Sequence, residues 1–396
     1  MTMSTERAPD VVVIGAGIVG AACALAAARA GLQVTVVDRG TIAGGTSSGG
    51  EGNLLVSDKP AGPELDLALH SLGHWEELSA YLEQLTGRPG GGFEFEHKGG
   101  LMVAARAETL PVLAALSQGQ RARGVEALTV DADRLHDVEP HLADGLAGGV
   151  LYPQDGQLQP ILATAAMLAA ARHHGATVRT NTAVTGLLRA GERVTGVVLD
   201  GWESLAASCV VNASGPWSGA LAALAGVHLP VLPRRGVVLV TQPLPPLVRR
   251  KVYAAEYVSD VASDHPGLES SAVVEGTPSG TILIGASRER VGFEDAMPLP
   301  VVRRLATQAV TLFPILAAVR LLRTYRGFRP YCPDHLPVIG EDPRAPGLVH
   351  ACGHEGAGIV LAAGTGQLVA EVVTGGTPSV DLHPFRPERF EGEGHE

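Results

Sequence analysis

Three glycines near the start of the chain have the spacing of a loop that binds phosphate. Gly15, Gly17 and Gly20 form a G-x-G-x-x-G pattern directly after the apolar run Val11–Ile14. The first glycine permits a tight turn, the second lets a pyrophosphate approach the backbone, and the third lets a helix pack closely on a strand. The free N–H groups and positive end of the following helix attract phosphate. The spacing therefore predicts a site for the ADP part of a dinucleotide.

A carboxylate follows at the position where a ribose would bind. Asp38 stands directly after the apolar run Val34–Val37, which is a predicted strand, so its side chain can accept hydrogen bonds from ribose hydroxyls. Residues 19–30 between the two strands are expected to form a helix that ends at Gly31. These residues alone leave NAD and FAD equally open.

A polar, glycine-rich segment comes next, at residues 41–53. It has no apolar periodicity, and such a long loop inside a compact domain is often functional. We expect its hydroxyls and backbone N–H groups to extend the phosphate site. The alternative is a surface connection.

The remaining pattern predicts a mixed α/β fold. Hydrophobic periodicity favours helices over residues 63–85, 108–124, 161–174, 216–225 and 299–313. Strands are expected within 93–104, 177–199, 209–215, 230–240 and 268–287, with a loop over 253–265. We expect a Rossmann-type domain with a parallel central sheet, built from residues 1–90, 150–226 and 320–396. An interleaved antiparallel substrate domain would contain residues 91–149 and 227–319.

Composition limits the function. The 396 residues carry a net charge of −11, which argues against a broad surface for nucleic acid or anionic membrane. The four cysteines are far apart in sequence, so no metal site is expected and a reducing, cytoplasmic setting fits. We expect no signal peptide, and no helix long and uninterrupted enough to span a bilayer.

Three later motifs make the prediction more specific. Residues 211–217 fit V-x-A-x-G-x-W, residues 327–340 fit G-x-R-P-x-x-P-D-x-x-P-x-I-G, and residues 353–359 form a glycine loop before a last helix. In order and spacing these motifs resemble the D-amino-acid oxidase family of FAD enzymes, from Val11 to about Gly375. Within that family, the chain looks most like the flavin subunits of D-hydroxyproline and proline dehydrogenases and hydrogen cyanide synthase, and the glycine and sarcosine oxidases.

The resemblance implies FAD as the cofactor. Asp38 would contact the adenosine ribose, Arg39 would lie beside the adenine, and the 353–359 loop would surround the flavin ring. Cys332 raises the question of a covalent flavin bond, but its local pattern differs from that of the enzymes with such a bond, so we expect non-covalent FAD. The full implied set of cofactor-binding residues is Gly15, Gly17, Ile18, Val19, Gly20, Asp38, Arg39, Gly45, Thr46, Ser47, Gly52, Asn53, Val184, Ser214, Gly215, Trp217, Gly353, His354, Glu355, Gly356, Gly358 and Ile359.

Arg329 is the residue that the resemblance and its chemistry both favour for substrate binding. A planar guanidinium binds a carboxylate through two charge-assisted hydrogen bonds. We expect Arg329 to lie in a loop between an Arg-Gly turn and two prolines, which favours this role over the alternative of an ordinary ion-paired surface arginine. Further candidates are His354 beside the flavin and two tyrosines, Tyr253 and Tyr257, for which packing is the competing interpretation.

Other side chains are weaker candidates for the same site. Tyr331 is a third tyrosine for which packing competes with a role at the substrate carboxylate. Glu51 and Glu355 are candidate partners for a substrate amine.

The implied reaction is oxidation of the Cα–N bond of a small amino or imino acid, such as a D-amino acid, hydroxyproline, proline or sarcosine. A hydride would pass to flavin N5 and an imino acid would leave. No side-chain base is required if the amine is already deprotonated.

Two alternatives remain open at this point. One is a flavin subunit, in a homo- or hetero-oligomer, that passes electrons to a partner subunit or a quinone and lies at the membrane periphery. The other is an NAD(P)-linked reductase or a non-catalytic dinucleotide-binding module.

Overall fold

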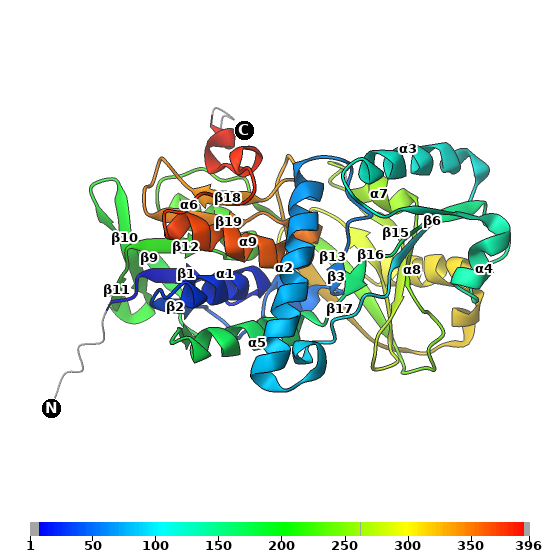
Figure 1. Ribbon diagram of the computed structural model, residues 1–396, viewed down its shortest axis with the longest axis horizontal. Helices are drawn as coiled ribbons and strands as arrows, with labels where there is room; N and C mark the ends of the chain where they lie inside the picture. Colours follow the sequence, from blue (N-terminus) through cyan, green and yellow to red (C-terminus); the bar gives the residue numbers. More distant parts are fainter. Residues whose placement is uncertain (1–7, 262, 392–396) are drawn as a thin grey trace.

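The computed structural model describes residues 8–261 and 263–391. Figure 1 shows an elongated molecule in which helix α2 (Pro63–Thr86) crosses between two halves, each built around a β-sheet. Pro63 occupies the first turn of α2, and Gly87 ends the helix in the left-handed conformation with φ of 67°. Most of residues 1–10, where no signal peptide is expected, lie outside the described residues.

The first half contains the predicted parallel sheet. Its strand β1 (Val11–Ile14) is fully buried and pairs in parallel with a neighbour on each side. An all-apolar strand suits this position because both faces of the sheet are covered. Only the edge strand β18 is antiparallel. The strand order is β18 (Val338–Glu341), β19 (Leu348–Cys352), β12 (Cys209–Asn212), β1, β2 (Val34–Val37) and β8 (Thr177–Arg179).

The alanine-rich segments of the chain form three buried helices, which pack beside this sheet and against α2. They are α1 (Ile18–Arg29), α5 (Pro160–His173) and α9 (Gly358–Val373). A Cβ added at Gly366 of α9 would lie 2.6 Å from the carbonyl carbon of Ala22 on α1. Ser71 of α2 donates a 2.5 Å hydrogen bond to the carbonyl of Val360. Small side chains therefore let these helices pack closely, which fixes the N-termini of α1 and α9 relative to each other.

The second half contains an eight-stranded sheet that is antiparallel except where β14 pairs with β4. Helix α8 (Leu299–Leu312) buries its apolar face against this sheet, and both contribute to one hydrophobic cluster. The mainly antiparallel arrangement confirms the predicted fold class. The strand order is β17 (Leu321–Tyr331), β13 (Leu232–Thr241), β16 (Ile282–Arg288), β15 (Glu269–Gly276), β14 (Lys251–Ala254), β4 (Gly100–Ala104), β6 (Gly148–Tyr152) and β5 (Leu128–Asp131).

Smaller elements complete the described chain. A three-stranded antiparallel sheet contains β9 (Val184–Ala190), β10 (Arg193–Leu199) and β11 (Ser204–Ala206), and β3 (Asn53–Leu54) pairs with β7 (Gly156–Gln157). The other helices are α3 (Leu110–Arg121), α4 (Leu135–Val138), α6 (Ser218–Ala223) and α7 (Glu256–Val261).

Some elements differ from their prediction. Residues 253–265 are not simply a loop, because they include the end of β14 and helix α7, and residue 262 lies outside the described residues. Within 93–104 only one strand, β4, forms. Strand β17 pairs with β13 along its length, so part of the segment assigned to the Rossmann-type domain belongs to the second sheet. Such long-range pairing is invisible to local periodicity. The division into two domains stays a prediction.

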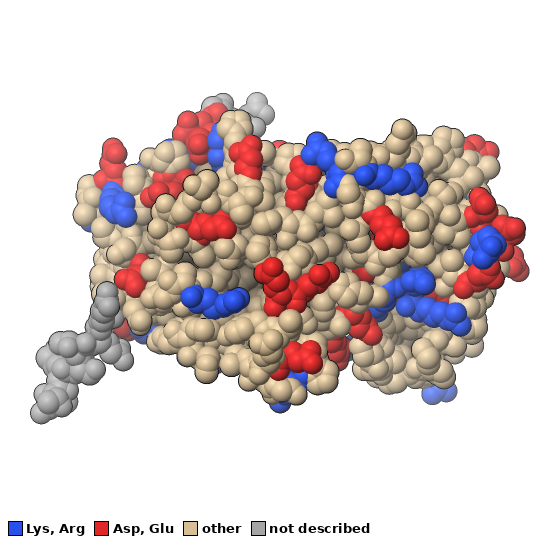
Figure 2. Space-filling view, in the orientation of Figure 1, with Lys and Arg blue, Asp and Glu red and all other residues tan. Residues whose placement is uncertain are grey.

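We expected no helix long and uninterrupted enough to span a bilayer, and by length and composition this expectation is wrong. Residues 355–373, which contain α9, are 19 residues long with a mean hydropathy of 1.5, which is enough to cross a bilayer. Here 61% of that segment is buried inside the molecule, as in the core helix of a soluble protein. On the face shown in Figure 2, acidic and basic side chains are interspersed, in keeping with a chain that has no excess of basic residues.

Candidate active site

A cavity of about 770 Å³ runs between the carboxyl ends of the first sheet's strands and the second sheet. Ligand pockets typically measure about 300–1,000 Å³. Glycines make up much of its lining, so backbone groups are exposed where side chains would otherwise fill the space. These glycines are Gly15, Gly17, Gly40, Gly44, Gly45, Gly49, Gly50, Gly215, Gly236, Gly327, Gly356 and Gly358.

The glycine turn has the predicted conformation. Gly15 has φ of +114°, in the region that favours glycine, and a Cβ there would collide with the carbonyl of Ala213. A Cβ at Gly20 would collide with the carbonyl of Gly15, so this position must be glycine for α1 to pack against the turn. The first and third glycines thus have their expected structural roles, and Gly17 lines the cavity.

Asp38 lies at the end of β2 and lines the cavity. Its carboxylate accepts hydrogen bonds of 2.7 Å from the N–H groups of both Ala16 and Gly40. Asp38 therefore holds the glycine turn in place. A carboxylate oxygen can accept more than one hydrogen bond, so the predicted ribose contact is still available.

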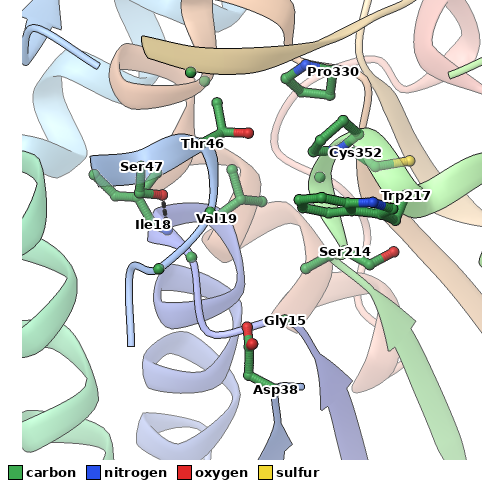
Figure 3. A pocket seen from close by; sticks show the side chains of 18 of the residues that line it. Gly15, Ile18, Val19, Asp38, Thr46, Ser47, Ser214, Trp217, Pro330 and Cys352 are labelled. Atoms are coloured by element: carbon green, nitrogen blue, oxygen red, sulfur yellow. Dashed lines mark hydrogen bonds between the residues drawn. The ribbon is translucent and has the colours of Figure 1, made fainter. Parts of the chain in front are cut away.

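Ser47 and Thr46 belong to a short 3₁₀ turn at Thr46–Gly49. Ser47 Oγ accepts a 2.9 Å hydrogen bond from the N–H of Ile18, at the start of α1 (Figure 3). Thr46 Oγ1 donates a 2.5 Å hydrogen bond to the carbonyl of Phe328 on β17. The segment predicted to extend the phosphate site therefore connects the start of α1 to the second sheet.

Trp217 lies in the turn after β12 and, like Val19, lines the cavity (Figure 3). The guanidinium of Arg39 lies 3.9 Å from the centre of the Trp217 ring, and the ring of Phe293 stacks on it at 5.1 Å. Arg39, predicted to lie beside an adenine, is thus held on this aromatic pair at the cavity wall.

Arg329 was predicted to lie in a loop, but it lies in strand β17, where its side chain lines the cavity. Its guanidinium donates a 2.9 Å hydrogen bond to the carbonyl of Ser287. Among the described residues it has no carboxylate partner within 4 Å. Burial, reinforced by the charge of Arg288, lowers the pKa of Arg329 to about 10. A partly buried cation without a counter-ion is costly, so this group is suited to bind an anion.

Glu355, by contrast, has its own partners. It is 2.6 Å from Arg234 and 2.8 Å from His335. Burial would raise the pKa of Glu355, but the hydrogen bond from His335 and the charge of Arg234 hold it below its usual value. Glu355 lines the cavity as predicted, yet it is poorly placed to serve a substrate amine because both oxygens are already paired.

His354 lies beside the cavity and is 3% exposed. Its Nε2 is 3.0 Å from Thr365 Oγ1 on α9. Burial lowers the pKa of His354 to about 3, so the imidazole is neutral at physiological pH. It can contact a flat ring without adding positive charge, and it is a poor general base.

The three tyrosines differ. Tyr257 lines the cavity, with Arg288 4.7 Å above its ring. Tyr253 does not line it: the fully buried hydroxyl donates to Ser57, and burial raises its pKa well above the usual value. The prediction of a catalytic role for Tyr253 is therefore not supported, because packing holds it behind Tyr257. Tyr331 donates a 2.7 Å hydrogen bond to Asp264.

All four cysteines are buried and free. Cys332 is not among the residues that line the cavity, and burial raises its pKa well above the usual value. A protonated thiol behind the wall cannot attack a cofactor, which fits the expectation of non-covalent binding.

Most of the predicted cofactor-binding residues do line the cavity. Those that line it are Gly15, Gly17, Ile18, Val19, Asp38, Arg39, Gly45, Thr46, Ser47, Asn53, Val184, Ser214, Gly215, Trp217, His354, Glu355, Gly356, Gly358 and Ile359. Three predicted glycines lie outside the lining, namely Gly20, Gly52 and Gly353. A Cβ at Gly52 would collide with the carbonyl of Leu158, and one at Gly353 would lie 2.5 Å from Cys332 Sγ. These glycines permit close packing just behind the wall.

Several lining residues were not predicted. Asn181, Thr182 and Ala183 lie near Asp38, and Thr182 N donates a 2.8 Å hydrogen bond to the carbonyl of Asp38. Gly236 and Gly327, which pair across β13 and β17, line the other end. Gly327 begins the 327–340 motif, which could have pointed to it, whereas the sheet pairing that brings Gly236 to the cavity leaves no local sequence pattern.

The lining fits a dinucleotide with an aromatic ring system. A carboxylate and a glycine turn at a helix N-terminus lie toward one end, and the unpaired Arg329 and the neutral His354 lie among the second-sheet and α9 residues. The model of the family "FAD dependent oxidoreductase" matches residues 10–372.

Known proteins give the same result over nearly the full chain. The chain is 29% identical to hydrogen cyanide synthase subunit HcnC of Pseudomonas aeruginosa, covering 98% of each chain. It is 30% identical to the glycine oxidase of Geobacillus kaustophilus, covering 97% of this chain and 98% of the other. The crystal structure of that oxidase superposes with a TM-score of 0.87 at 29% identity, covering 97% and 99% of the two chains. The chain belongs to the family of FAD-dependent oxidoreductases, and FAD is its cofactor.

Proposed function

We propose that this enzyme oxidises the Cα–N bond of a small amino or imino acid to an imino acid. The observation that carries the proposal is Arg329: a partly buried guanidinium without a carboxylate partner among the described residues, on the wall of the FAD cavity. A substrate carboxylate would supply the missing counter-ion through charge-assisted hydrogen bonds.

The chain's own residues would bind and orient the substrate. Bound FAD would accept the hydride that leaves the α-carbon, while the nitrogen loses a proton and the Cα–N single bond becomes a double bond. Arg329 would hold the carboxylate, and the buried Tyr257 would close the cavity wall beside it. Since His354 is neutral and bonded to Thr365, the arrangement supplies orientation rather than a general base.

The relatives support a small substrate. Two of them are named glycine oxidase and one, a human protein, sarcosine dehydrogenase; the chain matches the last over 41% of its length. Glycine and sarcosine have no side chain beyond the α-carbon. An NAD(P)-linked reductase gains no support from these comparisons.

A second candidate arrangement is a flavin subunit that passes electrons to a partner chain. HcnC is named as a subunit of a synthase, which favours this possibility. Co-purification of a second chain would support it, and turnover of the isolated chain with oxygen would argue against it. A cytoplasmic location remains a prediction.

Anaerobic titration of the FAD-loaded enzyme tests the proposed reaction. Each of a panel of D- and L-amino acids, prolines and N-methylglycine is added while flavin absorbance is followed. We expect at least one small amino or imino acid to bleach the flavin, and NADH not to. Bleaching by NADH alone would contradict the proposal.

A further inference from the structure

A second charged side chain in the cavity wall has an oxygen atom without a hydrogen-bond partner. Glu51 lines the cavity, and its side chain is 5% exposed. Its Oε2 accepts a 3.1 Å hydrogen bond from Asn53 Nδ2, but its Oε1 has no hydrogen-bond partner among the described residues. An orphaned carboxylate oxygen in a buried wall is costly unless a ligand donates to it.

Glu51 shares its neighbouring cation with a second carboxylate. Lys251 Nζ lies 3.7 Å from Glu51 and 3.2 Å from Glu275, so one ammonium faces two carboxylates. Lys98, which is also near Glu275, has a separate partner in Glu96 at 3.5 Å. Glu275 is fully buried and does not line the cavity. Glu51 therefore has only a share of Lys251, which lies closer to Glu275.

Glu51 and Arg329 both contact strand β16. The guanidinium of Arg329 donates to the carbonyl of Ser287. Glu51 Oε1 lies against Gly285, two residues earlier, where a Cβ would collide with it. A positive and a negative group are thus presented close together to the same cavity, without an ion pair between them within 4 Å among the described residues. These two charges are complementary to those of an amino acid, with Arg329 opposite its carboxylate and Glu51 opposite its amino group.

We infer that Glu51 accepts a hydrogen bond from the amino group of the substrate while Arg329 binds its carboxylate. The inference rests on the proposed function and deepens it by naming the residue that recognises the substrate amine. An amine donates at least one N–H hydrogen bond and carries positive charge when protonated, whereas a methyl group in its place offers neither. Glu51 is accordingly a residue that selects substrate.

The test compares two unreactive ligands on the FAD-loaded enzyme. 2-Aminoisobutyrate has no hydrogen on its α-carbon, so it can bind without being oxidised there. Pivalate has the same shape with a methyl group in place of the amine. The dissociation constant of each is measured from the perturbation of flavin absorbance, in wild type and in Glu51→Gln.

We expect wild type to bind 2-aminoisobutyrate more tightly than pivalate. In Glu51→Gln the ratio of the two dissociation constants should shift roughly tenfold toward pivalate, the equivalent of one charge-assisted hydrogen bond. Pivalate affinity should stay within about twofold of wild type. Equal preference in wild type and Glu51→Gln would overturn the inference, as would a wild type that does not distinguish the two ligands.

Glu275→Gln is the matched control, because it removes a carboxylate from the same cluster without touching the cavity wall. It should keep the preference; if it loses as much as Glu51→Gln, the cluster charge and not Glu51 is responsible, and the assignment is wrong. Should Glu51→Gln fail to retain FAD, Glu51→Asp keeps the charge beside Lys251 but shortens its reach, and the same loss of preference is expected, to a smaller degree. Failure of the proposed reaction would show separately, as absence of flavin bleaching by any amino acid.

Discussion

Arg329 and Glu51 reach strand β16 from different parts of the chain and contact it two residues apart, at Ser287 and Gly285. One comes from β17 and the other from the polar segment before β3. Neither is neutralised by the other within 4 Å among the described residues. The cavity therefore carries separate sites for an anion and a hydrogen-bond donor, which is what recognition of an amino acid requires.

Gly236→Ala should displace Arg329 without altering its charge. A Cβ at Gly236 would lie 2.7 Å from the guanidinium carbon, so the side chain must move. We expect KM for the amino acid substrate to rise roughly tenfold, the equivalent of one weakened charge-assisted hydrogen bond. Steady-state kinetics measures this. Gly186→Ala, a strand glycine with only ordinary contacts, is the control and should leave KM unchanged.

Asp38→Ala should weaken FAD binding. The carboxylate holds the N–H groups of Ala16 and Gly40, and its loss frees the glycine turn as well as removing the ribose contact. We expect the dissociation constant for FAD to rise roughly 10–100-fold, measured by flavin fluorescence during reconstitution of the apoprotein. Asp131→Ala, on the second sheet, should bind FAD as wild type does. Unaltered FAD affinity in Asp38→Ala would refute the role of this carboxylate.

His354 should make stability depend on pH below neutrality. Burial keeps its folded-state pKa at about 3, while in the unfolded chain it titrates near 6.5. The unfolded state therefore binds more protons as pH falls, and stability is lost below about pH 6.5. Thermal unfolding midpoints at pH 7.5, 6.5 and 5.5 should fall less steeply in His354→Asn than in wild type. The exposed His97→Asn should retain the wild-type slope, and an equally steep fall in His354→Asn would contradict the assignment.

The first strand–helix–strand unit could be predicted because its information is local. Gly15, Gly20 and Asp38 lie within 24 residues, and their spacing alone determines the turn and the packing of α1 on β1. The family motifs then identified the residues that contact the cavity far along the chain, including Arg329 and His354.

The other half of the site depends on pairings that leave no local pattern. Arg329 was expected in a loop because prolines and glycine surround it, yet β13 pairs with it and makes it part of a strand. Tyr253 was a candidate for the active site because of its phenol, but its position on β14 places it behind Tyr257, outside the cavity lining. The position of Glu51 against Gly285 likewise depends on the fold of the second sheet.

The central claim is that Arg329 binds the substrate carboxylate, and anaerobic bleaching of the flavin tests it most directly. The best amino acid of the panel is titrated into FAD-loaded wild type, Arg329→Ala and the control Arg323→Ala, an exposed arginine on the same strand. We predict that half-maximal bleaching requires roughly 100-fold more substrate in Arg329→Ala, about 3 kcal/mol, and the same substrate concentration as wild type in Arg323→Ala. Bleaching of Arg329→Ala at wild-type substrate concentrations, with FAD fully bound, would contradict it.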